Sequence, residues 1–600
     1  MGASSVRRRT ERRGLRLWPV GAVLVLTFAA VVLVAAAVFY TGWDLLGAQE
    51  LRPERRIDSK TLFDLVKLSF GVVAGAGALV ALVVAYRHQR VDEDGSLRED
   101  TRLHTERFTS AVSQLGDDSA AVRLGGVHAL AGLADDAPTR ALRQTCIDVL
   151  CAYLGLPYTA LADLPVDDVE AKHAYLALRR VRHTVIRLVR DHLRLAPHHP
   201  HSWQDHDFDF TAVTFDGGDL TDTEFAGTVD FSSAVFRDGI VDDDTVDFTG
   251  TMFSGTVNFT ATRFLGGTVN FTNAWFTDTA SFARAQFLGG RVIFKSVQFS
   301  QGSTVDFANA RFLQGTVDFA NACFHGRAAD FCHAWFHGGT VSFDRAEFVG
   351  DSVDFSRAKF KAGQVTFDHV RFSAGAVDFG VTEFSGAAVG FGEADFSGGA
   401  VSFRAAQLSD GIVTFRRSTL SDGTVTFNGA RFSGATVDFE RVRFTGGTLD
   451  FTGVYLTDGT VTFKESRFSN GTANFGHTQF DGSMVDFRRV EFSGISVSFE
   501  SAAFSASPVD FTEAEFSGGT VNFDRASFSG GTVTFRQAAF RDGVVNFGQQ
   551  FYIPLDRRFV GGTVDFSDAV GVSPSGLVPL AGRPLPPGLR LPSWWLPDGS

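Results

Sequence analysis

A phenylalanine recurs at every twelfth position from Phe307 to Phe547. A second phenylalanine follows five positions after most of these, as Phe312 follows Phe307. Each of the two has a valine or alanine two positions earlier, and residues two apart on an extended segment face the same side. Asp, Ser, Thr, Asn, Arg and Gly fill the positions between. The pattern predicts a β-solenoid in which each repeat packs only on its neighbours.

The spacing alternates between five and seven residues, which leaves the length of one coil open. A coil of a single period would hold two phenylalanines in a very narrow bore, and close packing forbids that. We therefore expect two periods, about 24 residues, per coil, with two pairs of phenylalanines on four sides. Residues 207–566 then give roughly 15 coils and a rod of about 70 Å. A longer, flatter β-solenoid is the alternative.

The two extra residues of the longer step are predicted to be glycine-rich corners, because glycine accepts a positive φ. Examples are Gly338-Gly339, Gly398-Gly399 and Gly518-Gly519. The first coils are less regular, with longer steps around Phe231 and Phe282. Another disturbance falls at residues 549–558, where a proline interrupts the period.

Uninterrupted five-residue steps with an apolar centre occur at Phe210, Phe215, Leu220 and Phe225. In these steps the chain resembles pentapeptide-repeat proteins. The resemblance implies a mainly β fold, a right-handed quadrilateral β-helix with one pentapeptide on each side. The alternation of five and seven departs from the family's pattern.

Two uncharged apolar stretches precede the repeats, at 17–40 and 68–86. The first would be about 36 Å long as a helix, and both are long enough to cross a bilayer. Arginines crowd residues 1–16, which predicts a basic cytoplasmic tail by the positive-inside rule. Residues 41–67 would form a short external loop, although they also carry basic residues. Two crossings place the N-terminus and the repeat domain in the cytoplasm of a multi-pass membrane protein.

The four cysteines do not form the pattern of a disulfide framework, in agreement with a cytoplasmic location. Cys146 and Cys151 are five apart on a predicted helix and are expected to be buried thiols. Cys323 and Cys332 are expected to be surface thiols on the outer side of the repeat.

Residues 87–195 are predicted to be a helical linker or cap module. Helical spacing of apolar residues is broken at Gly116-Asp117-Asp118 and at Asp135–Pro138, and further helices are expected at 139–154 and 167–194. Residues 106–130 resemble a helical module found between the membrane anchor and the repeats of actinobacterial membrane-anchored pentapeptide-repeat proteins. They also look like a HEAT-type helix pair. The segment would either dock a partner or act as a spacer that caps the open end of the β-helix, and the second is favoured.

Both flanks of the repeats differ from them in composition. Residues 196–206 form a histidine-rich linker, with His198, His199, His201 and His206. A metal site is the alternative there, and nearby prolines favour the linker. Residues 567–600 are a proline-rich tail in which Trp594 and Trp595 would fold back over the last coil as a cap, or else remain disordered.

We find no phosphate loop, nucleophile elbow or metal-ligand spacing, so no catalytic, cofactor-binding or metal-binding residue is predicted. A coil of two periods would stack acidic side chains into the column Asp306, Asp330, Asp354 and Asp378. The favoured explanation of this column is that aspartate suits a position next to a turn and that solvent and nearby arginines screen the charges. An acidic stripe for a basic partner or a divalent cation is the sharper alternative.

Charge narrows the choice of function. Residues 201–570 carry 45 acidic and 27 basic residues, a formal net charge of −18. An acidic rod argues against direct nucleic-acid binding. We expect a membrane-tethered scaffold that presents the rod to an unidentified protein, without catalysis or cofactor. The alternative is a DNA mimic that occupies a DNA-handling enzyme such as a topoisomerase. Mimicry is disfavoured by outward arginines, namely Arg416, Arg417, Arg441, Arg443, Arg488 and Arg489. The sequence does not predict an oligomeric state.

Overall fold

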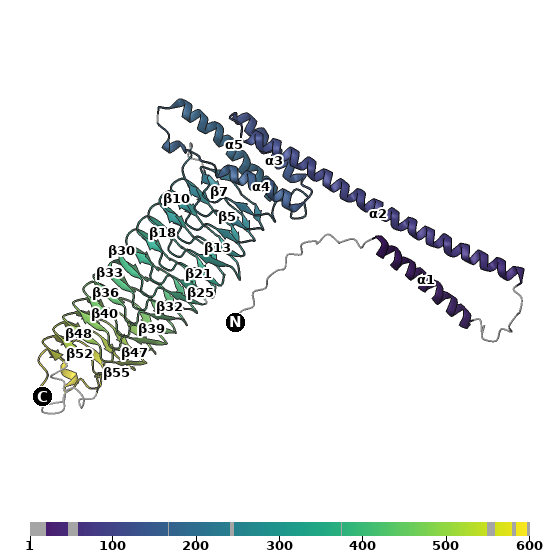
Figure 1. Cartoon of the computed structure of the whole chain (residues 1–600). Coiled ribbons are helices and arrows are strands. Elements are labelled where there is room, and N and C mark those ends of the chain that lie inside the picture. Colours follow the sequence, from purple (N-terminus) through teal and green to yellow (C-terminus); the bar gives the residue numbers. More distant parts are fainter. Residues whose placement is uncertain are drawn as a thin grey trace. The chain divides into compact units, whose positions relative to one another are not determined.

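The computed structural model describes residues 20–45, 58–165, 167–239, 245–373, 375–548, 559–578 and 584–596 (Figure 1). The chain divides into two compact units, residues 1–107 and 108–600. The predicted tail at 1–16 lies outside the described residues.

The first unit contains helix α1, Val20–Leu45, and most of helix α2, Ser59–Leu115. The predicted loop at 41–67 is therefore too long, and its residues 46–57 lie outside the described part. The stretch 68–86 is not a separate helix, because α2 continues through the charged residues that follow it. The two predicted membrane-spanning helices are not confirmed: within the described residues, no helix combines the length and apolar character that a crossing needs.

Three more helices follow α2 in the second unit: α3, Ala120–Asp135, α4, Arg140–Leu154, and α5, Val169–Leu193. Their limits agree with the breaks predicted from the sequence. Thr139 caps α4, because its hydroxyl accepts a hydrogen bond from the Leu142 amide at 3.3 Å. Asp168 caps α5 in the same way, accepting from the Ala171 amide at 2.9 Å. The backbones of α2 and α3 approach closely at Gly126, where a Cβ would lie 2.7 Å from the Leu115 nitrogen.

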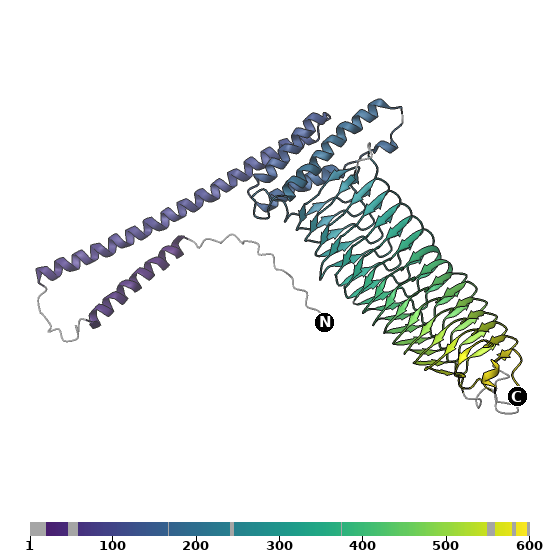
Figure 2. The ribbon, with the colours of Figure 1, turned by 180° about the vertical axis from the view of Figure 1, so that it is seen from behind.

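Most coils of the repeat tract contribute four short strands; β30, Glu383–Gly390, and β33, Gln407–Thr414, each run through two sides. The first coil has β1, Phe208–Asp209, β2, Thr214–Phe215, β3, Gly218–Asp219, and β4, Glu224–Phe225. The β1 column and the β4 column each form a sheet of 15 strands, and the β2 and β3 columns merge into one sheet of 29 strands (Figures 1 and 2). The four columns match the predicted four sides.

Strand register confirms the length of one coil. Strand β17, Thr304–Asp306, pairs in parallel with β21, Ala328–Asp330, so that Val305 lies opposite Ala329, two periods further along the chain. The same offset places Val317 opposite Val341 on the opposite side of the coil. The prediction of a mainly β solenoid of about 15 coils, each of about 24 residues, is therefore confirmed.

Phenylalanine rings fill the interior of every coil. Phe307 is fully buried and stacks on Phe331 of the next coil with centroids 4.8 Å apart and planes 2° from parallel. It also meets Phe319 from the opposite side of the bore, edge to face, at 5.6 Å and 86°. Both arrangements satisfy the ring quadrupole, and the buried alanines Ala310 and Ala322 leave room for them. The regular period thus places two facing columns of rings inside one coil.

Glycine serves the predicted corners where two backbones approach most closely. Gly339 has φ +69°, and a Cβ there would lie 2.3 Å from the carbonyl oxygen of Gly315 in the coil before. Gly519 has φ +76° and is equally crowded. Gly398 does not follow the prediction, because its φ lies outside the left-handed region, although a Cβ there would also be crowded.

The first coils vary in length. Phe215 pairs with Phe236 across a coil that is shorter than two periods, and Phe236 pairs with Phe264 across a coil that is longer. The predicted disturbance at 549–558 lies outside the described residues. Across it Phe528 pairs with Phe559, so this coil is also longer than the regular ones.

Both ends of the solenoid are covered. Helices α4 and α5 pack on β1 and β3, and Ile186 of α5 lies against Gly218 of the first coil. At the far end Trp595 is buried and donates from Nε1 to the Gly571 carbonyl at 2.9 Å. Its ring packs on Phe540 and Phe566 of the last coils. Trp595 thus folds back as predicted, whereas Trp594 is exposed.

Candidate functional site

The aspartate column exists and has a local structural role. Strand register places Asp306, Asp330, Asp354 and Asp378 on neighbouring coils. Each carboxylate Oδ1 accepts a hydrogen bond at 2.7 Å from the backbone amide two residues later. Asn474 and Ser402 accept the equivalent bond in their own coils. The position requires a hydrogen-bond acceptor rather than a charge, as the turn explanation expects.

The turn that these side chains cap contains a residue in the left-handed region. Asn309 has φ +60°, and the turn is closed by the Ala310 amide, which donates to the Phe307 carbonyl at 3.0 Å. Arg345 and Arg441 adopt the same conformation at the equivalent position. Such a conformation costs a non-glycine residue on the order of 1 kcal/mol. These turns were not predicted from the sequence, although Asn309 and Asn321 were an available signal for them.

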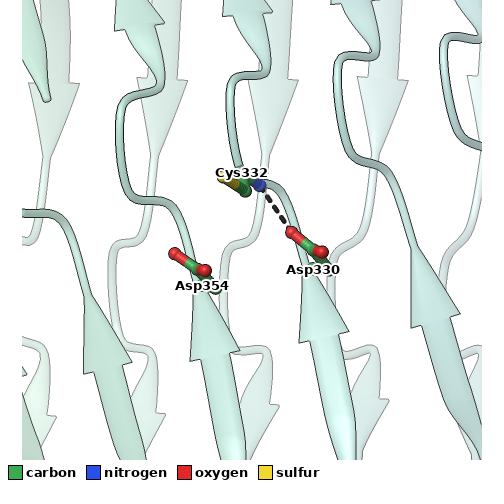
Figure 3. Close-up of side chains that lie close together, drawn as sticks. All are labelled: Asp330, Cys332 and Asp354. Carbon is green, nitrogen blue, oxygen red and sulfur yellow. Dashed lines mark hydrogen bonds between the residues drawn. The ribbon is translucent and has the colours of Figure 1, made fainter.

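One group of three possible metal ligands occurs among the described residues: Asp330, Cys332 and Asp354, whose ligand atoms all lie within 4.8 Å of one another (Figure 3). Burial raises the pKa of the Cys332 thiol, and burial with the neighbouring aspartates raises the pKa of Asp330. Metal binding requires the thiolate, which these shifts disfavour. Asp330 is also engaged in its turn. We therefore explain the group by the turn positions of two stacked coils.

The four histidines at 198–206 do not come together as ligands. His206 is buried, whereas His201 is exposed and lies 3.9 Å from Asp135. Trp203, in the same segment, is fully buried and stacks on His192 of α5 with centroids 4.0 Å apart. The segment packs as part of the helical module instead of running free as a linker.

The cysteines lie where the sequence predicted them. Cys146 and Cys151 are buried free thiols on α4, and burial raises the pKa of Cys146 to about 11. Cys323 and Cys332 are half-buried on the outer side of the solenoid and are also free.

A buried polar cluster surrounds Asp216 of the first coil, which is 2 % exposed. Its carboxylate accepts hydrogen bonds from the Tyr158 hydroxyl and, at 2.6 Å, from the Tyr175 hydroxyl. His183 Nε2 lies 3.1 Å away. Burial alone would raise the pKa of Asp216, but the bonds from His183, Tyr158 and Tyr175 hold it well below its usual range.

The same cluster ties α5 to the first coil. The Arg182 guanidinium is buried and donates to the Leu154 carbonyl and to the Thr214 carbonyl, both at 2.6 Å. Burial and the bond to Asp216 raise the pKa of Tyr175 to about 12. The cluster is thus a hydrogen-bonded anchor of the cap. Its members are far apart in sequence, which is why sequence reasoning did not find it.

Several of the outward arginines pair with acids of neighbouring coils. Arg441 contacts Glu465 at 2.8 Å, and Arg489 contacts Glu513 at 2.7 Å. Arg416 contacts Glu440 at 2.5 Å in the same way. Exposed pairs of this kind contribute little stability. They do interrupt the acidic surface, so the net charge is not presented as a uniform face.

The fold and surface define a repeat protein built as a capped β-solenoid. Residues 248–298 match a family model described as pentapeptide repeats (9 copies). No curated protein and no solved structure matches the chain.

Proposed function

We propose that this protein is a non-catalytic scaffold that is tethered to a membrane and presents its solenoid to another protein. The single observation that carries the proposal is the difference between the inward and the outward positions of the repeat. Phe, Val and Ala occupy the inside of nearly every coil, as at Phe379 and Val377, while the outward positions differ from coil to coil. A constant interior with a variable exterior suits a surface for recognition.

The tether is proposed from the first unit of the chain. Residues 17–40 and 68–86 carry no charge. Within them Phe28, Leu33 and Leu82 expose more than half of their surface. Exposed apolar side chains in such density favour contact with lipid. Arginines at 1–16 favour a cytoplasmic N-terminus, and a second crossing would return the solenoid to the cytoplasm.

DNA mimicry is the second candidate, supported by the net charge of −18 over residues 201–570. A mimic needs acidic groups spaced along a continuous face. The pairs that Arg441 and Arg489 form with acids of the next coils count against that. We predict that the solenoid fails to protect DNA gyrase in a supercoiling assay, and protection at stoichiometric amounts would favour mimicry over the scaffold.

The scaffold is tested by cross-linking from native membranes, with the tagged full-length chain as bait. We expect one or a few proteins to be enriched. A bait in which outward charges are reversed on the arginine edge, such as Arg441→Glu with Arg489→Glu, supplies a control with the same core. Capture that is identical for bait and empty membranes would contradict the proposal.

The tether is tested separately by alkaline carbonate extraction of the membrane fraction. We expect the full chain to stay with the membrane and a chain that begins at Phe108 to be released. A full chain that is released by carbonate would contradict the tether and leave the scaffold to be judged by the cross-linking alone.

A further inference from the structure

We infer that a hollow beside Trp275 is a binding site for a neutral oligosaccharide. The hollow has a volume of about 860 Å³ and crosses four coils, from Trp275 on β12, Trp275–Phe276, to Val349. Register places Trp275 opposite Gln298, and Gln298 opposite Cys323. Three coil steps of about 4.8 Å give a length of about 14 Å along the solenoid.

The hollow arises where the repeat departs from its period. The corner between Phe276 and Thr279 has two residues, and the corner between Phe299 and Thr304 has four. The next two corners have three residues each, as between Phe324 and Ala328. A short corner next to a long one leaves a recess in an otherwise even surface.

The long corner is built as a projecting turn. The Ser303 amide donates to the Ser300 carbonyl at 3.0 Å and closes it. Gly302 at its tip has φ +92°, and a Cβ there would have no neighbour within 4 Å. The base of the turn is held to the next coil, because the Ser303 carbonyl accepts a hydrogen bond from the Arg327 amide at 2.8 Å. The tip at Gly302 stands clear and lines the hollow with Gln301.

An aromatic platform lies at one end. Trp275 is 47 % exposed, and among the described residues no aromatic or cationic group stacks on its ring. Trp335, on another side of the solenoid, is 40 % exposed, but Arg311 lies 5.5 Å and Lys359 lies 6.0 Å from its ring. Of these two tryptophans, Trp275 is thus the one that offers an open apolar face with a hydrogen-bond donor at the edge of its ring.

Polar side chains line the rest of the hollow. Gln298 and Gln301 supply amides that both donate and accept, and His325 adds a ring nitrogen. Arg327 and Asp351 are exposed there, and the described residues give their side chains no hydrogen bond or ion pair. Their charges offset each other, so the hollow does not select for an ion.

A sugar ring matches this set of groups. One face of a pyranose is apolar and stacks on an aromatic ring, while its hydroxyls need paired donors and acceptors such as amides, carboxylates and guanidinium groups. The length of the hollow suits an oligosaccharide of a few units rather than a single sugar. Concave sites with one apolar wall and a few fixed polar groups are typical of small-ligand binding.

The test uses the full-length chain in a sugar-free detergent, titrated with maltotriose, cellotriose and mannotriose by calorimetry. We expect at least one trisaccharide to bind and to quench tryptophan fluorescence. Trp275→Ala should weaken that binding about tenfold, which corresponds to about 1.4 kcal/mol. Trp335→Ala is the matched control and should bind as the parent does.

A second variant tests the corner itself. Deleting Gln301 gives this corner the three residues of its neighbours, and we expect binding to be lost while the circular dichroism spectrum is retained. No binding of any of the three sugars would overturn the inference. Equal losses of sugar binding in Trp275→Ala and Trp335→Ala would also overturn it. So would binding of adenosine, titrated in the same way, if no sugar binds.

Discussion

The coils from Phe307 to Phe547 and the coils from Phe208 to Phe299 obey the same interior rule but differ outside. In the later tract the coils keep one length, as from Val317 to Val341, until the coil that starts at Phe528. The side-chain cap of the turn is common to both tracts, as at Asp247 and Asp306.

In the earlier tract coil lengths vary, and the cap docks on its first coil. The hollow beside Trp275 begins in this tract and extends into the later one as far as Val349. Regular spacing therefore reflects the packing of the core, whereas the irregular first coils are those on which the helical cap docks.

The largest effect is expected from removing a ring, in either tract. Phe379 is fully buried and stacks on Phe355 and Phe403 at 4.8 and 4.9 Å. Phe379→Ala should lower the free energy of unfolding by about 3–5 kcal/mol, measured by urea denaturation. Phe225→Ala in the first coil should do the same, because Phe225 is equally buried.

Phe379→Leu is the control for volume and should lose less than about 1.5 kcal/mol. Rings that lie outside the core would give alanine and leucine variants of equal stability. A loss at Phe379 without a loss at Phe225 would show that the two tracts do not share one interior rule.

The second-largest effect is expected from neutralising the Asp216 carboxylate of the first coil. The folded-state pKa of Asp216 is depressed, so its contribution to stability is present above the unfolded value of about 3.9 and is lost as the pH falls through the folded value. Asp216→Asn should lower the free energy of unfolding by about 2–4 kcal/mol at pH 7. The deficit relative to the parent should shrink below pH 4, as monitored by thermal unfolding from pH 7 to pH 2.

A parallel pH profile for parent and Asp216→Asn would contradict this assignment. His183→Leu serves as a second probe. It removes one of the hydrogen bonds to the carboxylate and should bring part of the same loss.

The third prediction compares alanine substitutions at two glycine corners, one crowded and one open. Gly339→Ala should lower stability by at least ~2 kcal/mol, because it combines a positive φ with a Cβ placed 2.3 Å from a carbonyl oxygen. Gly302→Ala keeps the strain of the positive φ but meets no atom, so a loss of about 1 kcal/mol is expected. Equal losses in urea denaturation would mean that neighbouring coils do not restrict the corner.

The smallest effect is expected in the aspartate column. Burial raises the folded pKa of Asp330, so ionisation there opposes folding above the unfolded pKa, and this penalty is relieved as the pH falls. Asp330→Asn keeps an acceptor for the Cys332 amide and should change stability by less than about 0.5 kcal/mol at pH 7, with any change a gain. Asp330→Ala removes the acceptor and should be the less stable variant; the reverse order would contradict the capping role.

Hydrophobic spacing was sufficient to predict the interior. Large rings at a fixed period allow few ways to close a coil, and Gly116 and Pro138 mark helix ends by local backbone chemistry. The rest depends on contacts between distant residues. Asp216 meets Tyr158 and Tyr175 across 58 and 41 positions. The change in polarity after residue 86 predicted a break, but α2 continues because helical backbone bonds do not require apolar side chains.

The coil length is tested most directly by a distance between spin labels at Thr316 and Thr436. Register connects them through Thr340, Gln364, Ala388 and Ile412, one coil at a time. The labels are placed in a chain whose four native cysteines are replaced. Double electron–electron resonance should then give a distribution of label-to-label distances centred at about 24 Å, from five steps of about 4.8 Å. Coils of a single period would double the number of steps, and a distribution centred at about 48 Å would contradict the account.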